Sequence, residues 1–525
     1  MLWRRLGTTR RVVQAFFFVA FLVLLFAALQ RRDAFPYADL FFRLDPLIAL
    51  TAMLAGKVWL PRLALAFVTV AMTIVLGRVW CGWICPLGTL LEWAQFKKAR
   101  RRAKRLPPRL PILKYLLLAA IVAAALFDNL TLMILDPLAL LTRATATAVI
   151  PGADWAILQI EDALRQAGIG QSAVDFFEQA SRGRVLPQTP AVFQQAVPAF
   201  LLLLAVVLLG LLADRFWCRF LCPLGALLGL LAKVAVLRPI VTPSLQHCAA
   251  CAGVCRQGAI TVVEEDEEEG GAGNGVPDPA EGARPGAVVV TSECVMCLDC
   301  LVAHGRKGMA YGVQPRPAPW QRYDPSRRQL LAGLAAGVGG VVLLGAGAWN
   351  ARRAAGLIRP PGVTDESVFL ASCVRCSQCL KVCPTSGLQP ALDEAGLVGL
   401  WTPVLKARLG YCDYGCHACG QMCPSGAIPK LDLATKRQQV LGLAWIDRDR
   451  CLPWAYDTTC VVCWEMCPVA DKAVKVTQVT VTAADGSELV LQRPHVVADL
   501  CIGCGICEYR CPVAGRAAIQ VTVSG

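Results

Sequence analysis

Four repeated cysteine motifs constrain this chain more than any other feature. Between residues 373 and 511, sixteen of the 26 cysteines fall into four quartets, and each quartet ends in Cys-Pro. The quartets are Cys373-Cys376-Cys379-Cys383, Cys412-Cys416-Cys419-Cys423, Cys451-Cys460-Cys463-Cys467 and Cys501-Cys504-Cys507-Cys511. Three close cysteines followed by a Cys-Pro step are typical of [4Fe-4S] binding, in which the fourth cysteine ligates a neighbouring cluster. Zinc motifs, the structural alternative, lack this pattern. We therefore predict four [4Fe-4S] clusters here.

An incomplete version of the motif lies upstream. Cys294, Cys297 and Cys300 form a triad, and Cys255 is placed to supply its fourth ligand. The other half of this motif keeps only two cysteines, so a cluster there would need a histidine ligand; the residues concerned are Cys248, Cys251, His247 and His304. The alternative is a lost cluster with leftover thiols. We predict one cluster in this stretch and leave the second open.

The first half of the chain repeats itself. Leu-Asp-Pro-Leu at 44–47 and 135–138 is followed, after an apolar stretch, by Trp-Cys-x3-Cys-Pro-Leu-Gly at 80–88 and 217–225. A residue before proline leaves helical geometry, and proline suits a first helical turn, so we expect a short helix after each cysteine pair. A pseudo-twofold duplication would bring four thiols together, namely Cys81, Cys85, Cys218 and Cys222. They could hold a [4Fe-4S] cluster, form a redox dithiol or soft-metal site, or be inert.

Apolar stretches predict a membrane part. Only 17% of the residues are charged, against about 25% in average soluble proteins. We expect five spans, roughly at 12–29, 63–77, 110–127, 197–213 and 329–348, with a half-helix at 47–60. Basic residues precede the first, third and fifth spans, which places the N-terminus and the stretch 214–328 in the cytoplasm and the C-terminal part outside. Ser326-Arg327-Arg328 also resembles a twin-arginine export signal before the fifth span.

The expected fold class is therefore an α-helical membrane domain of about five helices plus α+β ferredoxin-like 4Fe-4S domains. The expected domains are a membrane domain at 1–240, a partly degenerate cytoplasmic ferredoxin-like domain at 241–320, a signal-anchor helix at 326–350 and a four-cluster domain at 360–525. We expect a solvated acidic loop at 264–283, and alternation around Asp485-Gly486 predicts a β-hairpin. The role of an insertion at 150–196 is not readable.

The sequence argues against nucleic-acid binding, haem binding and nucleotide binding. The formal net charge of +14 does not indicate nucleic-acid binding, because the basic residues flank apolar stretches and negatively charged clusters would offset them. The four histidines lie outside the apolar stretches and there is no C-x-x-C-H, so we expect no haem. No nucleotide-binding motif is present either.

The motifs resemble two known protein families. Residues 1–312 are similar to NapH-type membrane ferredoxins, whose WCxxxCP pairs the NosR and MauN proteins share. Residues 326–525 resemble NapG/MauM-type exported polyferredoxins, including Arg359-Pro-Pro-Gly362 and Tyr414-Gly-Cys-His-Ala-Cys419. The chain looks like a fusion of the two.

This resemblance implies a quinol dehydrogenase-type relay in a bacterial inner membrane. Its five to seven [4Fe-4S] clusters would connect the quinone pool to a periplasmic redox enzyme or cytochrome, as an electron-transfer component rather than a terminal catalyst. Related polyferredoxins imply a nested pairing, in which the first quartet exchanges its fourth ligand with the fourth quartet and the second exchanges with the third. The triads would be completed, in chain order, by Cys511, Cys467, Cys423 and Cys383.

The sequence offers only two candidate residues for a quinone site. Asp45 and Asp136 of the Leu-Asp-Pro-Leu repeats are ionisable groups near the membrane and are candidates for it. Helix capping explains them equally well. A different class of function is a metal-handling or maturation factor for a periplasmic metalloenzyme, in which the membrane Cys-x3-Cys-Pro pairs would exchange electrons or metal.

Overall fold

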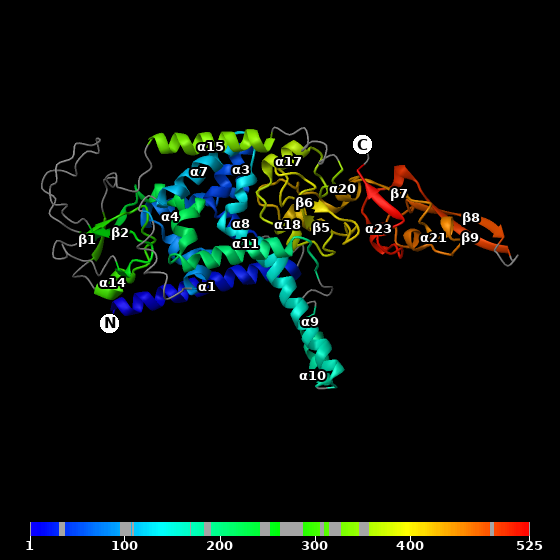
Figure 1. Ribbon diagram of the computed structural model, residues 1–525, viewed down its shortest axis with the longest axis horizontal. Helices are drawn as coiled ribbons and strands as arrows, with labels where there is room; N and C mark the ends of the chain where they lie inside the picture. Colours follow the sequence, from blue (N-terminus) through cyan, green and yellow to red (C-terminus); the bar gives the residue numbers. More distant parts are fainter. Residues whose placement is uncertain are drawn as a thin grey trace.

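The helical part of the molecule lies between two cysteine-rich parts that sit at its opposite ends (Figure 1). The computed structural model describes residues 2–30, 37–94, 107, 110–168, 170–182, 191–241, 253–262, 287–304, 309–313, 327–345, 356–482 and 488–523. The predicted acidic loop and Cys248, Cys251 and His247 lie outside the described residues. His304 ends a described helix, but its side chain lies outside them.

Two similar series of helices build the helical part. The first series contains α1 (Leu2–Gln30), α2 (Leu40–Arg43), α3 (Pro46–Gly56), η1 (Pro61–Leu63), α4 (Ala66–Leu76), η2 (Trp80–Ile84) and α5 (Pro86–Trp93). The second contains η3 (Leu110–Ile112), α7 (Leu113–Leu126), η4 (Thr131–Leu135), α8 (Pro137–Ala144), η5 (Thr145–Val149), α9 (Ile150–Gln166), α10 (Gln171–Ser181), α11 (Ala196–Leu208), η6 (Leu209–Leu211), η7 (Trp217–Leu221) and α12 (Pro223–Ala232). The insertion at 150–196 thus contains α9 and α10, which project from the side of the helical part (Figure 1).

Equivalent positions start equivalent helices in the two series. The Asp45 carboxylate accepts hydrogen bonds from the backbone N–H groups of Leu47 and Ile48 at 2.8 and 3.2 Å and so caps α3. Asp136 caps α8 in the same way, at 3.0 and 2.8 Å. In both helices proline occupies the first turn, where its missing N–H costs nothing. The sequence repeat is therefore a structural repeat.

One described helix is long and apolar enough to cross a membrane by length and composition, namely Gly7–Ala27 within α1. The other apolar stretches form shorter helices within Pro46–Gly56, Pro61–Leu76, Leu110–Leu126, Ala196–Leu211 and Pro223–Ala232. The fifth stretch forms α15 (Arg327–Gly345), which packs closely on α7 because a Cβ on Gly337 would lie 2.6 Å from the Ala120 carbonyl oxygen. Helices are thus found at all five expected places, while five membrane spans stay a prediction.

Short antiparallel strands and helices build the part next to the N-terminus of α1. Strand β1 (Leu237–Val241) pairs with β4 (Met309–Val313), β2 (Ile260–Val262) pairs with β3 (Ala287–Val289), and α14 (Asp299–His304) follows β3.

The C-terminal part has two lobes, which follow one another away from the helical part (Figure 1). The first contains α17 (Glu366–Ser372), α18 (Gln378–Lys381), β5 (Leu388–Pro390), β6 (Pro403–Leu405), α19 (Ala418–Gln421) and α20 (Leu433–Arg437). The second contains β7 (Leu443–Ile446), α21 (Leu452–Ala455), α22 (Val462–Glu465), β8 (Val474–Thr482), β9 (Glu488–Val496), η10 (Ala498–Leu500), α23 (Ile506–Arg510) and β10 (Ile519–Thr522). The antiparallel pair β8–β9 confirms the predicted hairpin, although its turn lies outside the described residues.

Candidate iron–sulfur sites

The two Cys-x3-Cys-Pro pairs converge as the duplication predicts. The first cysteine of each pair lies in a π-helical turn, η2 or η7. The second cysteine follows the turn directly and caps the next helix: Cys85 Sγ accepts the N–H of Gly88 at 3.4 Å, and Cys222 Sγ accepts that of Gly225 at 3.3 Å. The four thiols interact electrostatically with one another. We call this group site 2; its members are Cys81, Cys85, Cys218 and Cys222.

Two buried arginines flank site 2. Arg78 interacts electrostatically with Cys81 and Cys222, and Arg215 with Cys81 and Cys218. Each stands three residues before the first cysteine of its repeat, a regularity in the sequence that would have revealed them. A [4Fe-4S]²⁺ core with four thiolates carries a net charge of about −2. The two guanidinium groups would offset part of this charge, since each also pairs with a carboxylate, Arg215 with Glu92 at 3.5 Å and Arg78 with Glu293 at 3.6 Å.

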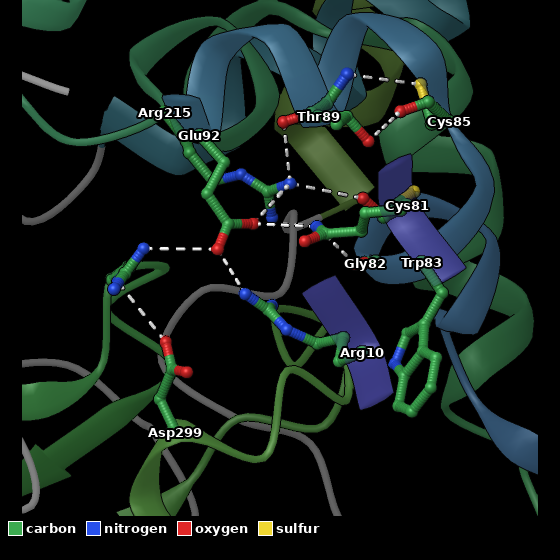
Figure 2. A network of polar contacts seen from close by, with 12 residues as sticks. Arg10, Cys81, Gly82, Trp83, Cys85, Thr89, Glu92, Arg215 and Asp299 are labelled. Carbon is green, nitrogen blue, oxygen red and sulfur yellow. Dashed lines mark hydrogen bonds and ion pairs between the residues drawn. The ribbon is translucent and has the colours of Figure 1, made fainter. Parts of the chain in front are cut away.

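Glu92 at the end of α5 ties site 2 to the surrounding elements (Figure 2). Its carboxylate pairs with Arg10 of α1, with Arg215 at 3.5 Å and with Arg256 at 3.1 Å. Gln14 of α1 also donates to it at 2.9 Å. Arg256 follows Cys255 directly and also pairs with Asp299 at 3.2 Å, beside Cys300. Glu92 therefore holds α1, the cysteine turn and the neighbouring cysteine triad in one arrangement.

The upstream triad gathers with Cys255, as predicted. The thiols of Cys255, Cys294, Cys297 and Cys300 interact electrostatically, and we call this group site 1. Site 1 packs directly on site 2, because a Cβ on Gly82 would lie 2.1 Å from the Val295 carbonyl oxygen. Arg215 interacts with Cys297 as well as with Cys218. Sites 1 and 2 are thus neighbours joined by one guanidinium.

Sixteen cysteines of the C-terminal part form four further groups. Site 3 contains Cys373, Cys376, Cys379 and Cys423. Site 4 contains Cys383, Cys412, Cys416 and Cys419. Site 5 contains Cys467, Cys501, Cys504 and Cys507. Site 6 contains Cys451, Cys460, Cys463 and Cys511. Every group therefore takes its fourth thiol from another quartet.

The nested pairing implied by the resemblance is wrong. The first quartet exchanges its fourth thiol with the second, so that Cys423 joins the first triad and Cys383 the second. The third and fourth quartets exchange in the same way, through Cys467 and Cys511. Packing explains this result. Helices α18 and α19 meet in the first lobe, whereas α22 meets α23 in the second, so each lobe pairs its own two quartets.

The two lobes join at sites 4 and 5. The Cys412 N–H donates to the Cys504 carbonyl oxygen at 2.8 Å, and the two thiols interact electrostatically. Cys379 of site 3 interacts with Cys419 of site 4, and Cys507 of site 5 with Cys463 of site 6. The spatial order in the C-terminal part is therefore site 3, site 4, site 5, site 6.

Site 3 lies against the helical part. Arg375 donates to Thr131 Oγ1 at 3.3 Å, and the Arg143 guanidinium stacks over the Trp401 ring at 3.8 Å. A single hydrophobic core extends from Cys85 and Cys222 of site 2 to Cys376 of site 3. These contacts connect sites 1 and 2 with the four sites of the C-terminal part.

The thiol groups fit a cluster better than a single ion. Among the described residues, no three His, Cys, Asp or Glu side chains are gathered tightly enough to hold one metal ion. The four thiols of site 4 instead line one common pocket, and the four thiols of site 6 line another. Burial raises the pKa of Cys412 to about 12 and that of Cys504 to about 11, so binding of iron must displace protons from these thiols. The residues present fit [4Fe-4S] groups.

The structure brings Asp45 and Asp136 of the two repeats together. Both are fully buried, each caps its helix with one oxygen, and their carboxyl groups contact each other. The second oxygen of each carboxyl meets no N–H or O–H donor among the described residues. Capping is thus observed, while quinone binding by this pair stays a prediction.

Comparisons with known proteins match the cysteine-rich regions. A family model described as a 4Fe-4S binding domain matches residues 58–107 and 195–241, which include both Cys-x3-Cys-Pro pairs. A second, described as a 4Fe-4S dicluster domain, matches residues 458–514. No solved structure is significantly similar to the chain.

Curated relatives match parts of the chain. The methylamine utilization ferredoxin-type protein MauM of Methylorubrum extorquens is 36% identical over 207 residues, which are 38% of this chain and 89% of MauM. The ferredoxin-type protein NapG of Escherichia coli is 34% identical over 202 residues, which are 37% of this chain and 84% of NapG. Protein NirI of Paracoccus denitrificans is 29% identical over 49% of this chain and 30% of its own length. The chain belongs to the family of the ferredoxin-type proteins MauM and NapG and carries multiple [4Fe-4S] clusters for electron transfer.

Proposed function

We propose that the chain is a membrane-bound relay of the quinol dehydrogenase type, a fusion of a NapH-like and a NapG/MauM-like protein. It would pass electrons from a quinol in the membrane to a redox enzyme or cytochrome in the periplasm. The observation that carries this proposal is the order of the six thiol sites: site 1 adjoins site 2, sites 3 to 6 follow one another through the two lobes, and one hydrophobic core lies between sites 2 and 3. A protein that used isolated clusters for structure alone would not need this order.

The surface of the helical part supports a position in lipid. Large apolar side chains are exposed along three of its helices; they include Val12, Phe16, Val19 and Val23 of α1, Phe67, Val68 and Val75 of α4, and Leu201, Leu204 and Leu208 of α11. Apolar surface of this extent is rare on soluble monomers and marks contact with a membrane or a partner. With the helical part in the bilayer, site 1 would lie on the cytoplasmic side and sites 4–6 on the periplasmic side, as positive-inside orientation predicts.

The chemistry is single-electron transfer. A quinol that is oxidised to the quinone releases two electrons and two protons. The clusters would supply the capacity to accept and donate these electrons one at a time. The electrons would pass along sites 3 to 6 to an acceptor at the exposed end of the second lobe, and the protons would leave to water on the same side. Sites 1 and 2 extend the series towards a cytoplasmic electron donor.

The geometry of site 2 favours this relay over a metal-handling role. Thiol exchange and metal delivery need an accessible, nucleophilic thiolate. Cys85 and Cys222 are only 7% and 6% exposed, and their Sγ atoms accept backbone N–H groups, while Cys81 and Cys218 are partly buried. Such thiols are suited to hold a cluster in place.

Loss of site 2 should have different consequences for an electron relay and for a maturation factor. The double variant Cys81→Ser/Cys218→Ser should block electron transfer between a reduced cytoplasmic donor and a periplasmic cytochrome in membrane vesicles, while the metal content of the partner enzyme stays normal. A metal-depleted partner enzyme would contradict the relay and support the maturation role. The matched control is Cys460→Ser in site 6, which should block the same transfer from the other end.

A further inference from the structure

We infer that Asp45 and Asp136 share one proton and take up a second one when the group held by site 3 is reduced. The pair is then a proton-binding site that is linked to the electron at site 3. The inference rests on the fit of site 3 to a [4Fe-4S] group and not on the identity of the electron donor, so it goes beyond the proposed relay.

The contacts of the two carboxyl groups require a proton between them. One oxygen of each accepts the backbone N–H groups that begin its helix, at distances between 2.8 and 3.2 Å. The other oxygens, Asp45 Oδ2 and Asp136 Oδ2, are buried without an N–H or O–H donor among the described residues, and the two carboxyl groups lie within hydrogen-bond reach of each other. Two ionised carboxylates can only accept hydrogen bonds, and they repel each other. One protonated carboxyl group instead donates its O–H to its neighbour.

A metal ion does not fit this place. Calcium takes about six to eight oxygen ligands and magnesium about six, whereas the pair offers two free oxygens. No third His, Cys, Asp or Glu side chain joins them in a metal-binding group among the described residues. Both aspartates are 0% exposed. Burial raises the pKa of Asp136 to about 6, and burial together with the charge of Asp136 raises the pKa of Asp45. These shifts agree with one shared proton at neutral pH.

The elements packed against α3 and α8 offer few other charged groups. The helices α4, α11 and α12 and the turns η4 and η5 contain none. The charged side chains of α2, α5, α7 and α17 form ion pairs with other residues; they are Arg43, Glu92, Lys114 and Glu366. Tyr115 of α7 donates to Glu293 at 3.1 Å. Arg143 of α8 remains as the cation that acts on the pair.

Arg143 connects the pair to site 3. Its buried guanidinium interacts electrostatically with Asp136 on one side and with Cys376 of site 3 on the other. It is held in place by a hydrogen bond to the Ile134 carbonyl oxygen at 3.1 Å and by the Trp401 ring at 3.8 Å. Reduction of site 3 adds a negative charge to this buried region. A nearby negative charge favours the protonated form of a carboxyl group, so the pair should then bind its second proton.

The step balances in charge and in atoms. Site 3 gains one electron from its donor, and the pair gains one proton from the solvent. Both carboxyl groups are then neutral, and the net charge of the buried region is unchanged. When site 3 passes its electron to site 4, the second proton returns to the solvent.

Infrared difference spectroscopy of the full-length protein, reduced with dithionite minus oxidised, detects the second proton. The wild type should show a new C=O stretching band of a protonated carboxyl group, and this band should shift in D2O. Asp45→Asn/Asp136→Asn should lose the band and keep its iron and sulfide, because asparagine caps helices as well as aspartate does. The matched control is Asp365→Asn. Asp365 caps α17 beside site 3 through N–H groups at 2.7 and 3.1 Å but is exposed, so this variant should keep the band.

Two cysteine variants test whether the proton follows site 3. Cys423→Ala removes the fourth thiol of site 3, and Cys511→Ala removes the equivalent thiol of site 6. EPR shows which cluster each variant has lost. The carboxyl band should disappear in Cys423→Ala and remain in Cys511→Ala.

Three results would overturn the inference. The first is a wild type without the band although EPR shows that site 3 is reduced. The second is a band that persists in Asp45→Asn/Asp136→Asn. The third is a band that persists in Cys423→Ala, which would detach the proton from site 3. None of them contradicts the proposed function, because dithionite and not a quinol supplies the electron in these measurements.

Discussion

Replacement of Glu92 by glutamine should loosen the arrangement around site 2. The Glu92 carboxylate forms ion pairs with Arg10, Arg215 and Arg256. The side chains of Arg10 and Arg215 are each only 2% exposed. Loss of the carboxylate leaves the buried Arg10 guanidinium without its ion-pair partner, while Arg215 keeps its hydrogen bond to the Gly88 carbonyl oxygen at 2.9 Å. Breaking a buried pair costs about 3–5 kcal/mol. Arg256 is 21% exposed, and its pair should add no more than about 1 kcal/mol.

Hydrogen exchange measures this loss locally. A decrease of about 3 kcal/mol in the free energy of local opening should speed amide exchange in the segment from Cys81 to Glu92 by about 100-fold. The control is Glu178→Gln, because Glu178 pairs with Arg165 on the exposed side of the α9–α10 hairpin, where both side chains are more than 40% exposed. That variant should change exchange in its own helix by less than tenfold. Equal, small effects of the two substitutions would refute the view that Glu92 holds site 2 in place.

Three further predictions concern the C-terminal sites. Cys423→Ser should alter the EPR signal of the cluster held by the first triad, and Cys383→Ser that of the second; nested pairing would instead shift the damage to the third and fourth triads. Cys463→Ser should stop reduction of a periplasmic cytochrome while quinol still reduces the clusters of sites 3–5, and unchanged cytochrome reduction would contradict the proposed exit at site 6. Reconstitution of the clusters from iron and sulfide should slow as the pH falls from 8 to 6, because burial raises the pKa of Cys412 to about 12 and of Cys504 to about 11, and thiols must lose protons to bind iron. Reconstitution that is independent of pH would show that deprotonation does not limit it.

Local sequence patterns predicted the local structure well. The Cys-Pro steps, the Asp-Pro caps and the β8–β9 hairpin depend on residues close together in the chain, and the structure has all of them. The duplication also predicted that Cys81, Cys85, Cys218 and Cys222 would meet, because a repeated motif can be related by symmetry.

Features that depend on tertiary packing were not predictable in this way. Spacing shows that a Cys-Pro cysteine leaves its own triad, but which triad it joins depends on which lobes pack together. Arg78 and Arg215 are visible in the sequence as a repeat, yet their role follows only from their burial beside the thiols. Arg375 and Thr131, which join site 3 to the helical part, are 244 residues apart in the sequence, and no local pattern could bring them together.

Freeze-quench EPR after mixing oxidised full-length protein with menadiol tests the central claim most directly. The relay predicts that electrons appear within the turnover time and that the integrated spin exceeds one per chain, because several linked clusters share them. The contradictory result is a protein whose clusters are reduced by dithionite but remain oxidised with menadiol, since quinol would then not be the electron donor.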